Sequence, residues 1–340
     1  MKRAYSFDDV LLRPKYSDLT SRGQVDLSSN LDSKTTLSLP VISSPMDTVT
    51  EDAMAVSMSR SGGLGIIHRY NTIEEQVELV SSARDAGAPS IGAAIGMTGD
   101  YLDRAMAVND AGASVLCVDV AHGHHAMMRR ALYELKEVFG SGTHIMAGNV
   151  ATLEAFEDLA SWGADSIRVG IGGGSICSTR LVTGHGVPTF QSILDVSKTT
   201  SEAKIIADGG IKTTGDMVKA LAAGADAVMV GSMLAGTEET PGETLFTANG
   251  EKYKVYRGMA SSAAQRSWRG KSSTPEGISA TVPYRGTVDD VLKDIDGGIR
   301  SGLSYTGTRT IAEFQSKAEF LHQTNAGQSE SKTHILWRHK

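Results

Sequence analysis

The chain has 340 residues, of which 40% are hydrophobic, and its formal net charge is −6. That length suits one (β/α)8 barrel with an added loop or tail, and the hydrophobic content is enough for a sizeable core. The acidic balance gives no electrostatic reason to expect nucleic acid or an anionic membrane as a partner.

The start of the chain, its apolar runs and its cysteine content predict the cellular compartment of the protein. Residues 1–9 have no apolar stretch behind their two basic residues, so we expect no signal peptide. The longest apolar runs, such as 113–120, have the length of a strand and are too short to cross a bilayer. The two cysteines, Cys117 and Cys177, do not make a disulfide framework and fit a reducing compartment. We therefore expect a cytoplasmic protein.

Eight apolar segments, taken in chain order, predict parallel strands that alternate with helices. In four places a polar-amphipathic run ends in Gly-Ala and a short Val/Ile-rich run follows, which is typical of a helix C-terminus leading into a buried strand. This alternation favours an α/β fold of the (β/α)8 TIM-barrel type, with an open doubly wound sheet as the alternative. The strands are expected at about 41–46, 63–68, 90–96, 114–120, 144–150, 166–171, 204–208 and 227–232.

Two of the intervening helices have clear start signals. Thr72-Ile-Glu-Glu75 is a candidate capping box, and Thr213-Thr-Gly-Asp216 places a hydroxyl and a carboxylate at another helix N-terminus.

The pattern changes after the eighth strand. Residues 245–256 hold Asn249-Gly250 between two β-rich runs, which predicts a hairpin with a type I′ turn. Residues 257–285 are rich in Gly, Ser and Arg without a period, and predict a long loop that is a candidate active-site flap. Helices are expected at about 287–301 and 309–321, before a partly disordered polar tail at about 323–340. We expect residues 1–340 to form a single barrel domain.

Polar and glycine residues gather where each apolar strand ends, which is where a (β/α)8 barrel builds its site. These strand ends are Met46-Asp47, His68-Arg69, Gly96-Met97, Asp119-Val-Ala-His122, Gly148-Asn149, 170–180, Asp208-Gly-Gly210 and Gly231-Ser232.

The most informative strand end is Gly170-Ile-Gly-Gly-Gly-Ser-Ile-Cys-Ser-Thr-Arg180. Its glycines let backbone N–H groups converge on an anion or carbonyls converge on a cation, and Ser175 adds a hydroxyl for a phosphate. Cys177 follows on a loop, where a thiolate can reach a ligand, so we interpret it as a nucleophile rather than a structural thiol. Cys117 lies within a strand, where a buried inert thiol is expected.

Two further strand ends suit phosphate binding. Asp208-Gly-Gly210 and Gly231-Ser232 follow the seventh and eighth strands, whose loops commonly bind phosphate with backbone amides. Asp208 has no cation within its own loop, so we expect it to accept hydrogen bonds from a ribose diol rather than form a salt bridge. The alternative is that these glycines only make tight turns.

The segment Ala121-His-Gly-His-His125 suggests a metal site, but no matching cluster elsewhere supplies a third ligand. Hydrogen bonding at the start of a helix is the favoured interpretation.

These motifs, taken together, resemble the IMP dehydrogenase/GMP reductase family from about residue 7 to 322. Besides the glycine-rich loop and Asp208-Gly-Gly210, the resemblance rests on the following segments: Phe7-Asp-Asp-Val-Leu-Leu-Arg-Pro14, Met46-Asp-Thr-Val49, Val230-Gly-Ser-Met-Leu-Ala-Gly-Thr-Glu-Glu239 and Tyr256-Arg-Gly-Met259. The fold that the resemblance implies is the barrel derived above.

The resemblance also implies a mechanism. Cys177 would add to purine C2 of GMP, ammonia would leave, NADPH would deliver hydride to C2 and IMP would depart. Thr179 and Glu276 would move the proton that ammonia needs. Because a glutamate side chain is ionised near neutrality and has no proton to donate unless it is desolvated, flap closure would have to desolvate Glu276.

The remaining site residues follow from the resemblance. Those implied for the nucleotide are Met46, Ser175, Asp208, Gly210, Gly231, Ser232, Tyr256, Gly258 and Met259. Those implied for the dinucleotide are Asp119, Ala121 and Asn149. Backbone carbonyls of Gly172, Gly174 and Cys177 would hold a potassium ion, and the assembly would be a homotetramer.

Three features resemble a reductase more than a dehydrogenase of this family. The chain passes from 86–88 to Ser90 with no room for inserted CBS modules. The flap segment 260–274 lacks the Arg-Tyr pair that activates water in dehydrogenases. The segments 13–22 and 119–124 also resemble reductases, whereas 236–239 and 326–331 resemble dehydrogenases.

GMP reductase is therefore the leading hypothesis. The alternatives are an IMP dehydrogenase without CBS modules, which would oxidise IMP to XMP with NAD and use Arg266 or Arg269 as its base, and a purine-nucleotide-binding protein without turnover. Two departures from the family stand out: Gly173 replaces a usual proline, which would loosen the cation loop, and the flap lacks an Ala-Glu-Tyr-Arg run before its glutamate.

Overall fold

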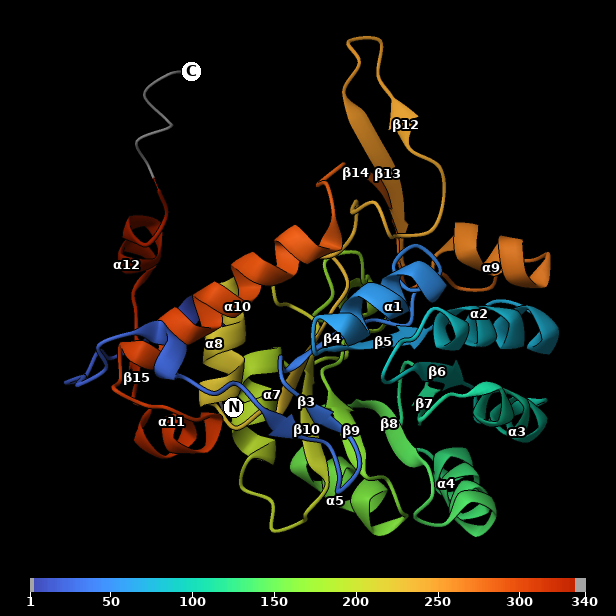
Figure 1. The fold of residues 1–340 in the computed structure, drawn as a ribbon, viewed down its shortest axis with the longest axis horizontal. Coiled ribbons are helices and arrows are strands. Elements are labelled where there is room, and N and C mark those ends of the chain that lie inside the picture. The colour runs from blue at the N-terminus through green and yellow to red at the C-terminus, as the bar shows by residue number, and fades with distance from the viewer. Residues whose placement is uncertain (1–2, 334–340) are drawn as a thin grey trace.

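The computed structural model describes residues 3–333, and its centre is a closed barrel of eight parallel strands (Figure 1). The barrel confirms all eight expected strands and excludes the open sheet, although several strands are shorter than expected because their last residues turn into the site loops. The barrel strands are β4 (Val41–Ser43), β5 (Leu64–Ile67), β6 (Gly92–Ile95), β7 (Val115–Asp119), β8 (His144–Val150), β9 (Ser166–Val169), β10 (Lys204–Asp208) and β11 (Ala227–Val230).

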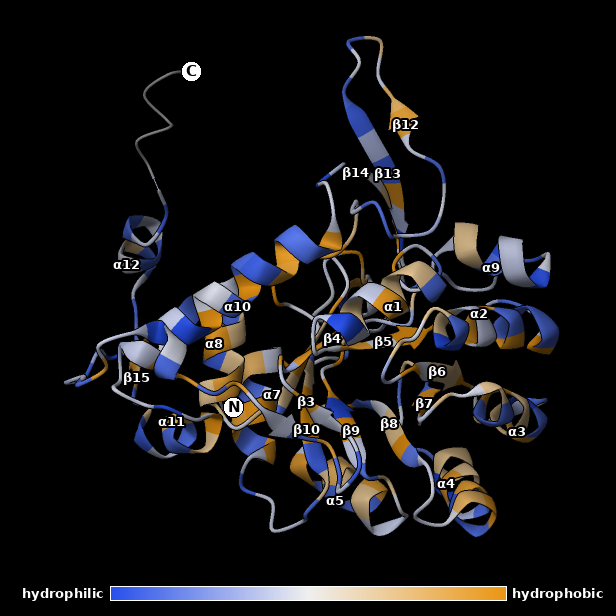
Figure 2. Cartoon of the chain, in the orientation of Figure 1, coloured by the Kyte–Doolittle hydropathy of each residue, from blue (hydrophilic) through white to orange (hydrophobic). Residues whose placement is uncertain are grey.

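Successive residues of each strand belong to two different cores. On β7, for example, Val115 and Cys117 pack inside the barrel, whereas Leu116 and Val118 pack against the surrounding helices. This follows from the two-residue period of a strand, and because both faces are buried, both are apolar. Figure 2 shows the ribbon at β5 in the colour of hydrophobic residues. On β9 the inward residues are instead polar: Ser166 and Arg168 are both buried.

Helices follow the barrel strands and cover the outside of the barrel. Both expected start signals are confirmed as capping boxes, with Thr72 bonded to Glu75 and Thr213 bonded to Asp216. The helices up to β11 are α1 (Asp52–Arg60), α2 (Ile73–Asp85), α3 (Tyr101–Ala111), α4 (Ala126–Phe139), α5 (Leu153–Ser161), α6 (Thr179–Thr183), α7 (Thr189–Val196) and α8 (Thr214–Ala222).

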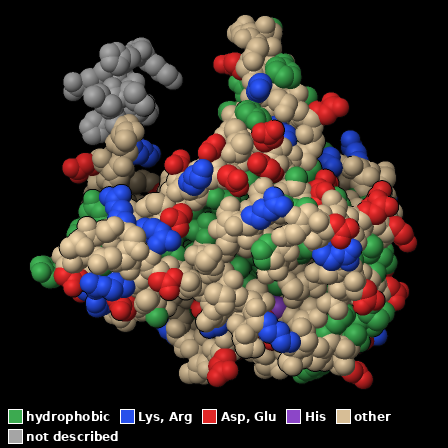
Figure 3. Space-filling view, in the orientation of Figure 1, with side chains coloured by type: hydrophobic (Ala, Val, Ile, Leu, Met, Phe, Trp, Pro, Cys, Tyr) green, Lys and Arg blue, Asp and Glu red, His purple; other side chains and the backbone are tan. Residues whose placement is uncertain are grey.

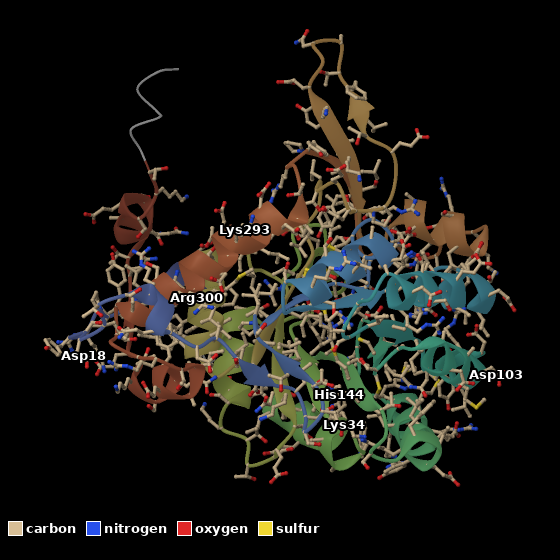
Figure 4. The ribbon with its side chains drawn as sticks, in the orientation of Figure 1. Asp18, Lys34, Asp103, His144, Lys293 and Arg300 are labelled. Carbon is tan, nitrogen blue, oxygen red and sulfur yellow. The ribbon has the colours of Figure 1, made fainter. Side chains whose placement is uncertain are left out.

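A small hairpin of β2 (Ser29–Asn30) and β3 (Thr36–Leu37) closes the N-terminal end of the barrel. Leu31 and Leu37 belong to the core inside the barrel. Asp32 accepts a hydrogen bond from His144, the first residue of β8, with 2.7 Å between Oδ2 and Nδ1. Figure 4 shows His144 beside the hairpin that carries Lys34.

A three-stranded sheet of β12 (Leu245–Phe246), β13 (Lys252–Arg257) and β14 (Ser279–Pro283) projects from the barrel (Figure 1). The expected hairpin is confirmed, but the type I′ turn is wrong. That turn needs a positive φ at both central residues, and Gly250 has φ +81° whereas Asn249 does not have a positive φ. The N–H of Gly250 instead bonds to Thr247 O, as in a type I turn followed by a left-handed glycine.

We expected the flap at 257–285 to be a long loop, but the structure differs. It contains helix α9 (Ser262–Arg269) and strand β14. The helix begins at Ser261, whose side chain accepts the N–H of Ala264, and ends at Gly270, which has φ +69°. Gln265 bonds to Ala260 O and to Ser273 N, so side chains of the flap fold it onto itself.

The C-terminal part adds α10 (Val288–Ser304) and α11 (Ile311–Lys317), which confirms both expected helices approximately. Residues at the end of the second prediction form a strand instead: β15 (Phe320–His322) pairs with β1 (Val10–Leu12) near the N-terminus. The expected polar tail also contains a short helix, α12 (Asn325–Glu330), and its last part, 334–340, lies outside the described residues.

The surface in Figure 3 shows basic and acidic side chains interspersed, so neither sign gathers on this face of the described residues. Leu245 and Phe246 are exposed on the projecting sheet. Within residues 3–333, every helix is too short or too polar to cross a membrane.

Candidate active site

A cavity of about 420 Å³ opens at the C-terminal ends of the barrel strands, a size typical of small-molecule sites. The catalytic, nucleotide, dinucleotide and cation-loop residues that the sequence predicts all line it, although they come from loops far apart in the chain. They are Met46, Asp119, Ala121, Asn149, Gly172, Gly174, Ser175, Cys177, Thr179, Asp208, Gly210, Gly231, Ser232, Tyr256, Gly258, Met259 and Glu276.

Cys177 lies at the end of the glycine-rich loop, immediately before α6. Its Sγ is 3.2 Å from Thr179 Oγ1, close enough for a hydrogen bond between the two side chains. The backbone of the flap pairs with this loop: Ser178 N donates to Glu276 O at 2.9 Å, and Ile278 N donates to Ile176 O at 3.0 Å. This pairing brings Glu276, about a hundred residues along the chain, to the cavity beside the thiol.

Cys117 is buried inside the barrel, which confirms that expectation. Burial raises the pKa of its thiol to about 12, so it stays protonated near neutrality. Of the two cysteines, only Cys177 reaches the cavity.

Asp208 forms a salt bridge, and the expectation that it would not is wrong. Arg168 on the neighbouring strand β9 reaches its Oδ2 at 2.9 Å, and Asn149 donates to the same oxygen at 2.8 Å. Sequence reasoning missed this pair because it searched only the loop of Asp208 for a cation. Since the contacts fall on Oδ2, Oδ1 has no protein partner within residues 3–333 and can accept a ligand hydroxyl.

Arg168 also bonds to the carboxylate of Asp119, so one buried guanidinium holds two carboxylates of the cavity. Burial alone would lower the pKa of Arg168, but Asp208 and Asp119 outweigh it and the net shift is upward. A charged residue in the middle of a predicted strand was the sequence signal for this role.

The end of the cavity at β10 and β11 has the features of a phosphate site. Gly209 and Gly210 both have positive φ, near +87° and +79°, which side chains rarely adopt. A Cβ at Gly231 would lie 3.0 Å from both Met46 Sδ and Tyr256 Oη, so these side chains converge there. Burial raises the pKa of Tyr256 to about 12, which keeps its hydroxyl a hydrogen-bond donor.

The proposed cation loop is only partly suited to an ion. Gly174 O already accepts the N–H of Cys177 at 3.1 Å, and a Cβ at Gly172 would lie 2.6 Å from Arg180 Cγ. Three carbonyls from one loop leave most of a potassium shell unfilled. The residues described here therefore do not complete a cation site by themselves.

The histidine segment behaves as the favoured interpretation expects. His125 is the N-cap of α4 and accepts the N–H of Met127, while His124 bonds to Asp158 at 2.8 Å. Within residues 3–333, no group of His, Cys, Asp or Glu side chains is arranged to hold a metal ion.

Several other cavity residues received no role from the sequence, among them Arg69, Tyr70, Arg168 and Thr274. Arg69 donates to the carbonyl of Asp119 at 3.0 Å. Its buried Nε has no hydrogen-bond partner among the described residues but lies 3.9 Å from Asp119 Oδ2. Tyr70 stacks on Trp268 of the flap helix, with 5.9 Å between ring centroids. Arg69 follows a predicted strand, but its contact with Asp119 depends on the packing of β5 near β7.

A closed (β/α)8 barrel with a cysteine beside glycine-rich loops at its C-terminal end defines a class of barrel proteins equipped for covalent chemistry on a phosphorylated ligand. Comparison with known proteins narrows the class. The chain belongs to the IMP dehydrogenase/GMP reductase family, because the family described as "IMP dehydrogenase / GMP reductase domain" matches residues 4–334.

The relatives carry both names. The chain is 36% identical to the inosine-5'-monophosphate dehydrogenase of Nitrosopumilus maritimus, covering 98% of each chain. It is 33% identical to the GMP reductase of Leishmania major, covering 97% of this chain and 96% of the relative. It also resembles a solved GMP reductase of Trypanosoma brucei, a cysteine-to-alanine variant in complex with guanosine 5'-monophosphate, with a TM-score of 0.93, 30% identity and 98% of each chain covered.

Alignment length does not separate the two reactions. The alignments with the Nitrosopumilus dehydrogenase and the Leishmania reductase run over 470 and 476 positions, so both relatives contain segments that this chain of 340 residues lacks. The missing insertion therefore does not favour a reductase, contrary to the first of the three sequence arguments.

Proposed function

We propose that this chain is a GMP reductase, which converts GMP to IMP and ammonia with NADPH as hydride donor. The observation that carries the proposal is the composition of the cavity around Cys177. Its neighbours there are Thr179 and, from the flap, Glu276, whereas Arg266 and Arg269 are exposed on α9 and do not line it. The flap thus places a carboxylate, and neither of these two guanidinium groups, in the cavity that holds the Cys177 thiol.

In the proposed reaction, the sulfur of Cys177 forms a bond to purine C2 of GMP. The bond from C2 to the exocyclic nitrogen then breaks, and the leaving ammonia takes up a proton. A reduced nicotinamide, when bound, supplies the hydride that C2 accepts. Release of the Cys177 thiolate yields IMP.

Thr179 and Glu276 are proposed to deliver the proton to the leaving nitrogen. Thr179 Oγ1 lies 3.2 Å from the sulfur, so it is close to any atom bonded to the carbon that the sulfur attacks. A hydroxyl can accept a proton from one group while it donates to another, so it can relay a proton from Glu276.

The other cavity residues are proposed to bind. Ser175 and the turns at Gly210 and Gly231 suit the nucleotide phosphate, and Asp208 Oδ1 suits a ribose hydroxyl. Asp119, Ala121 and Asn149 lie on the β7–β8 side of the cavity and are proposed to face the nicotinamide.

The competing proposal is an IMP dehydrogenase, which the similarity to relatives of that name supports. A dehydrogenase of this kind must activate water against the covalent adduct. A guanidinium loses a proton near neutrality only when burial and neighbouring cations lower its pKa by several units. Arg266 and Arg269 are both exposed, so the required burial is missing at these positions.

The test compares two substrate pairs by the near-ultraviolet absorbance of the reduced nicotinamide. GMP with NADPH should lose absorbance, whereas IMP with NAD should give little gain. Cys177→Ala should abolish turnover while IMP still binds, and Cys117→Ala serves as the matched control that retains turnover. Robust XMP formation that collapses when Arg266 and Arg269 are both replaced would make the protein a dehydrogenase.

A second measurement isolates the proton relay. Acid-quenched mass spectrometry of the wild type with GMP alone should show an adduct on Cys177, and Glu276→Gln should show much less of it. Equal adduct in both would remove Glu276 from the relay.

A further inference from the structure

Asp47 and Arg257 form an ion pair at the edge of the cavity that the proposed mechanism does not use. Arg257 Nη2 lies 2.6 Å from Asp47 Oδ2, and Arg257 Nε lies 3.0 Å from the same oxygen and 3.2 Å from Oδ1. The Asp47 side chain is only 9% exposed and that of Arg257 is 23% exposed. Such a forked, largely buried pair has a defined geometry, unlike a single contact between flexible surface charges.

Two backbone contacts reinforce this pair. Arg257 N donates to Thr48 Oγ1 at 3.1 Å, and Asp47 N lies 3.3 Å from Met259 Sδ, within hydrogen-bond range of sulfur. The loop after β4 and the end of β13 are therefore joined by both side chains and both backbones, although they are about two hundred residues apart in sequence.

Neither member of the pair lines the cavity, but their chain neighbours do. Met46 precedes Asp47, while Tyr256 and Gly258 flank Arg257, and all three line the cavity. Met46 Sδ and Tyr256 Oη also converge on Gly231, where each would lie 3.0 Å from an added Cβ. The distance between Met46 and Tyr256, at the end of the cavity proposed for the phosphate, thus depends on how the loop after β4 packs against β13.

We infer that Asp47 and Arg257 are positioning residues that set the width of the nucleotide site between Met46 and Tyr256. They act through their neighbours, since both side chains point at each other instead of at the ligand. Cys177 and Thr179 lie on another segment. Glu276 belongs to the same flap as Arg257, but its backbone pairs with the glycine-rich loop, so the ion pair governs binding of the nucleotide more than the chemistry at C2. This inference rests on the proposed nucleotide site.

The experiment measures the Kd of IMP by calorimetry, together with kcat and KM for GMP, in Asp47→Asn, Arg257→Gln and the double variant. Each single variant should weaken IMP binding and raise KM by about tenfold, with a smaller change in kcat, in line with couplings between contacting residues. The double variant should be no worse than the weaker-binding single variant, because the two groups act as one unit. Singles within twofold of wild type, or effects that multiply in the double variant, overturn the inference.

The matched control is Asp18→Asn. Asp18 pairs with Arg309 through two contacts of 3.1 and 3.2 Å, but it lies far from the projecting sheet (Figure 4). Its loss should leave the Kd of IMP unchanged. An equal loss of affinity in this control would mean that any weakened ion pair has the same effect, which would also overturn the inference.

Arg257→Lys keeps the positive charge but loses the forked contact with Asp47. This variant serves as the test if the other variants fail to fold. It should melt close to the wild type and still bind IMP more weakly, and unchanged affinity overturns the inference.

IMP binding does not require turnover, so the two proposals fail in different ways. A wild type that binds neither GMP nor IMP contradicts the proposed function, whereas a binding wild type with equally binding variants contradicts only the role of this pair.

Discussion

Thr189 Oγ1 is buried behind the glycine-rich loop and has no hydrogen-bond partner among the described residues. A Cβ at Gly173 would lie 2.5 Å from this hydroxyl, and the next nearest atoms, in Gly209, would be 3.3 and 3.4 Å away. The φ of Gly173 is not in the left-handed region. The space that Thr189 occupies, and not the backbone conformation, therefore restricts what can replace Gly173.

At the scale of residues, Gly173→Ala should cost about 1–3 kcal/mol of stability, because it forces an overpacked contact onto the loop that carries Cys177. Adding Thr189→Ala should recover most of that loss. Thr189→Val should not, because it removes the unpartnered hydroxyl but keeps the volume. Urea denaturation of the singles and doubles measures the coupling, and additive losses for Gly173→Ala and Thr189→Ala would contradict this steric account.

An aromatic contact joins the flap helix α9 to a residue of the cavity wall. Trp268 stacks on Tyr70 with an interplanar angle of 18°, and Tyr70 itself lines the cavity. The same flap carries Thr274 and Glu276 to the site. Because α9 and Glu276 belong to the same flap, we expect loss of the contact between α9 and Tyr70 to displace Glu276 as well.

At the scale of elements, Trp268→Ala should loosen the flap, since an aromatic pair contributes about 0.5–1.5 kcal/mol beyond burial of its area. We expect kcat/KM for GMP to fall by up to about tenfold and residues 257–285 to become more sensitive to protease. Trp268→Phe retains a ring and should change both much less. If Trp268→Ala keeps wild-type kinetics and protease resistance, other contacts hold the flap.

The barrel is closed at its opposite end by the Asp32–His144 contact, and His144 Nε2 also lies 2.8 Å from Ser166 Oγ. Burial lowers the pKa of His144 more than its bond to Asp32 raises it. Burial would raise the pKa of Asp32, but the N–H groups of Lys34 and Thr35 and His144 outweigh it, and the net shift is downward. The folded protein thus disfavours protonation of both groups.

At the scale of the whole molecule, stability should therefore fall as the pH is lowered. The unfolded chain protonates its histidines near pH 6.5, so the contribution of His144 is present above that pH and is lost below it. Asp32 adds a further loss at lower pH, as the pH falls below the ordinary carboxyl pKa toward its depressed folded value. Urea denaturation from about pH 7 to about pH 4 should show a shallower decline for His144→Gln than for the wild type.

The control for this measurement is His185→Gln, because His185 is exposed. It should reproduce the wild-type decline. A His144→Gln profile parallel to that of the wild type would show that this contact does not govern the acid response.

The order of elements and the location of the site follow from the sequence alone. Strands and helices are local patterns, since a Val/Ile-rich run after Gly-Ala needs no distant partner to be recognised as a strand. Because a barrel aligns the carboxyl ends of its strands, residues such as Cys177 and Asp208 could be assigned to one site before any distance was measured. Their placement around one cavity follows from that rule.

The tertiary structure decided whatever depends on contacts between distant segments. Asp208 meets Arg168 because β9 and β10 are neighbours, Trp268 meets Tyr70 across most of the chain, and β15 pairs with β1. The flap helix and the turn at Gly250 were mispredicted because short segments take their conformation from whichever packing and hydrogen bonds the assembled fold offers. Sequence periodicity predicts which face of a segment is buried, but it does not predict which other segment packs against that face.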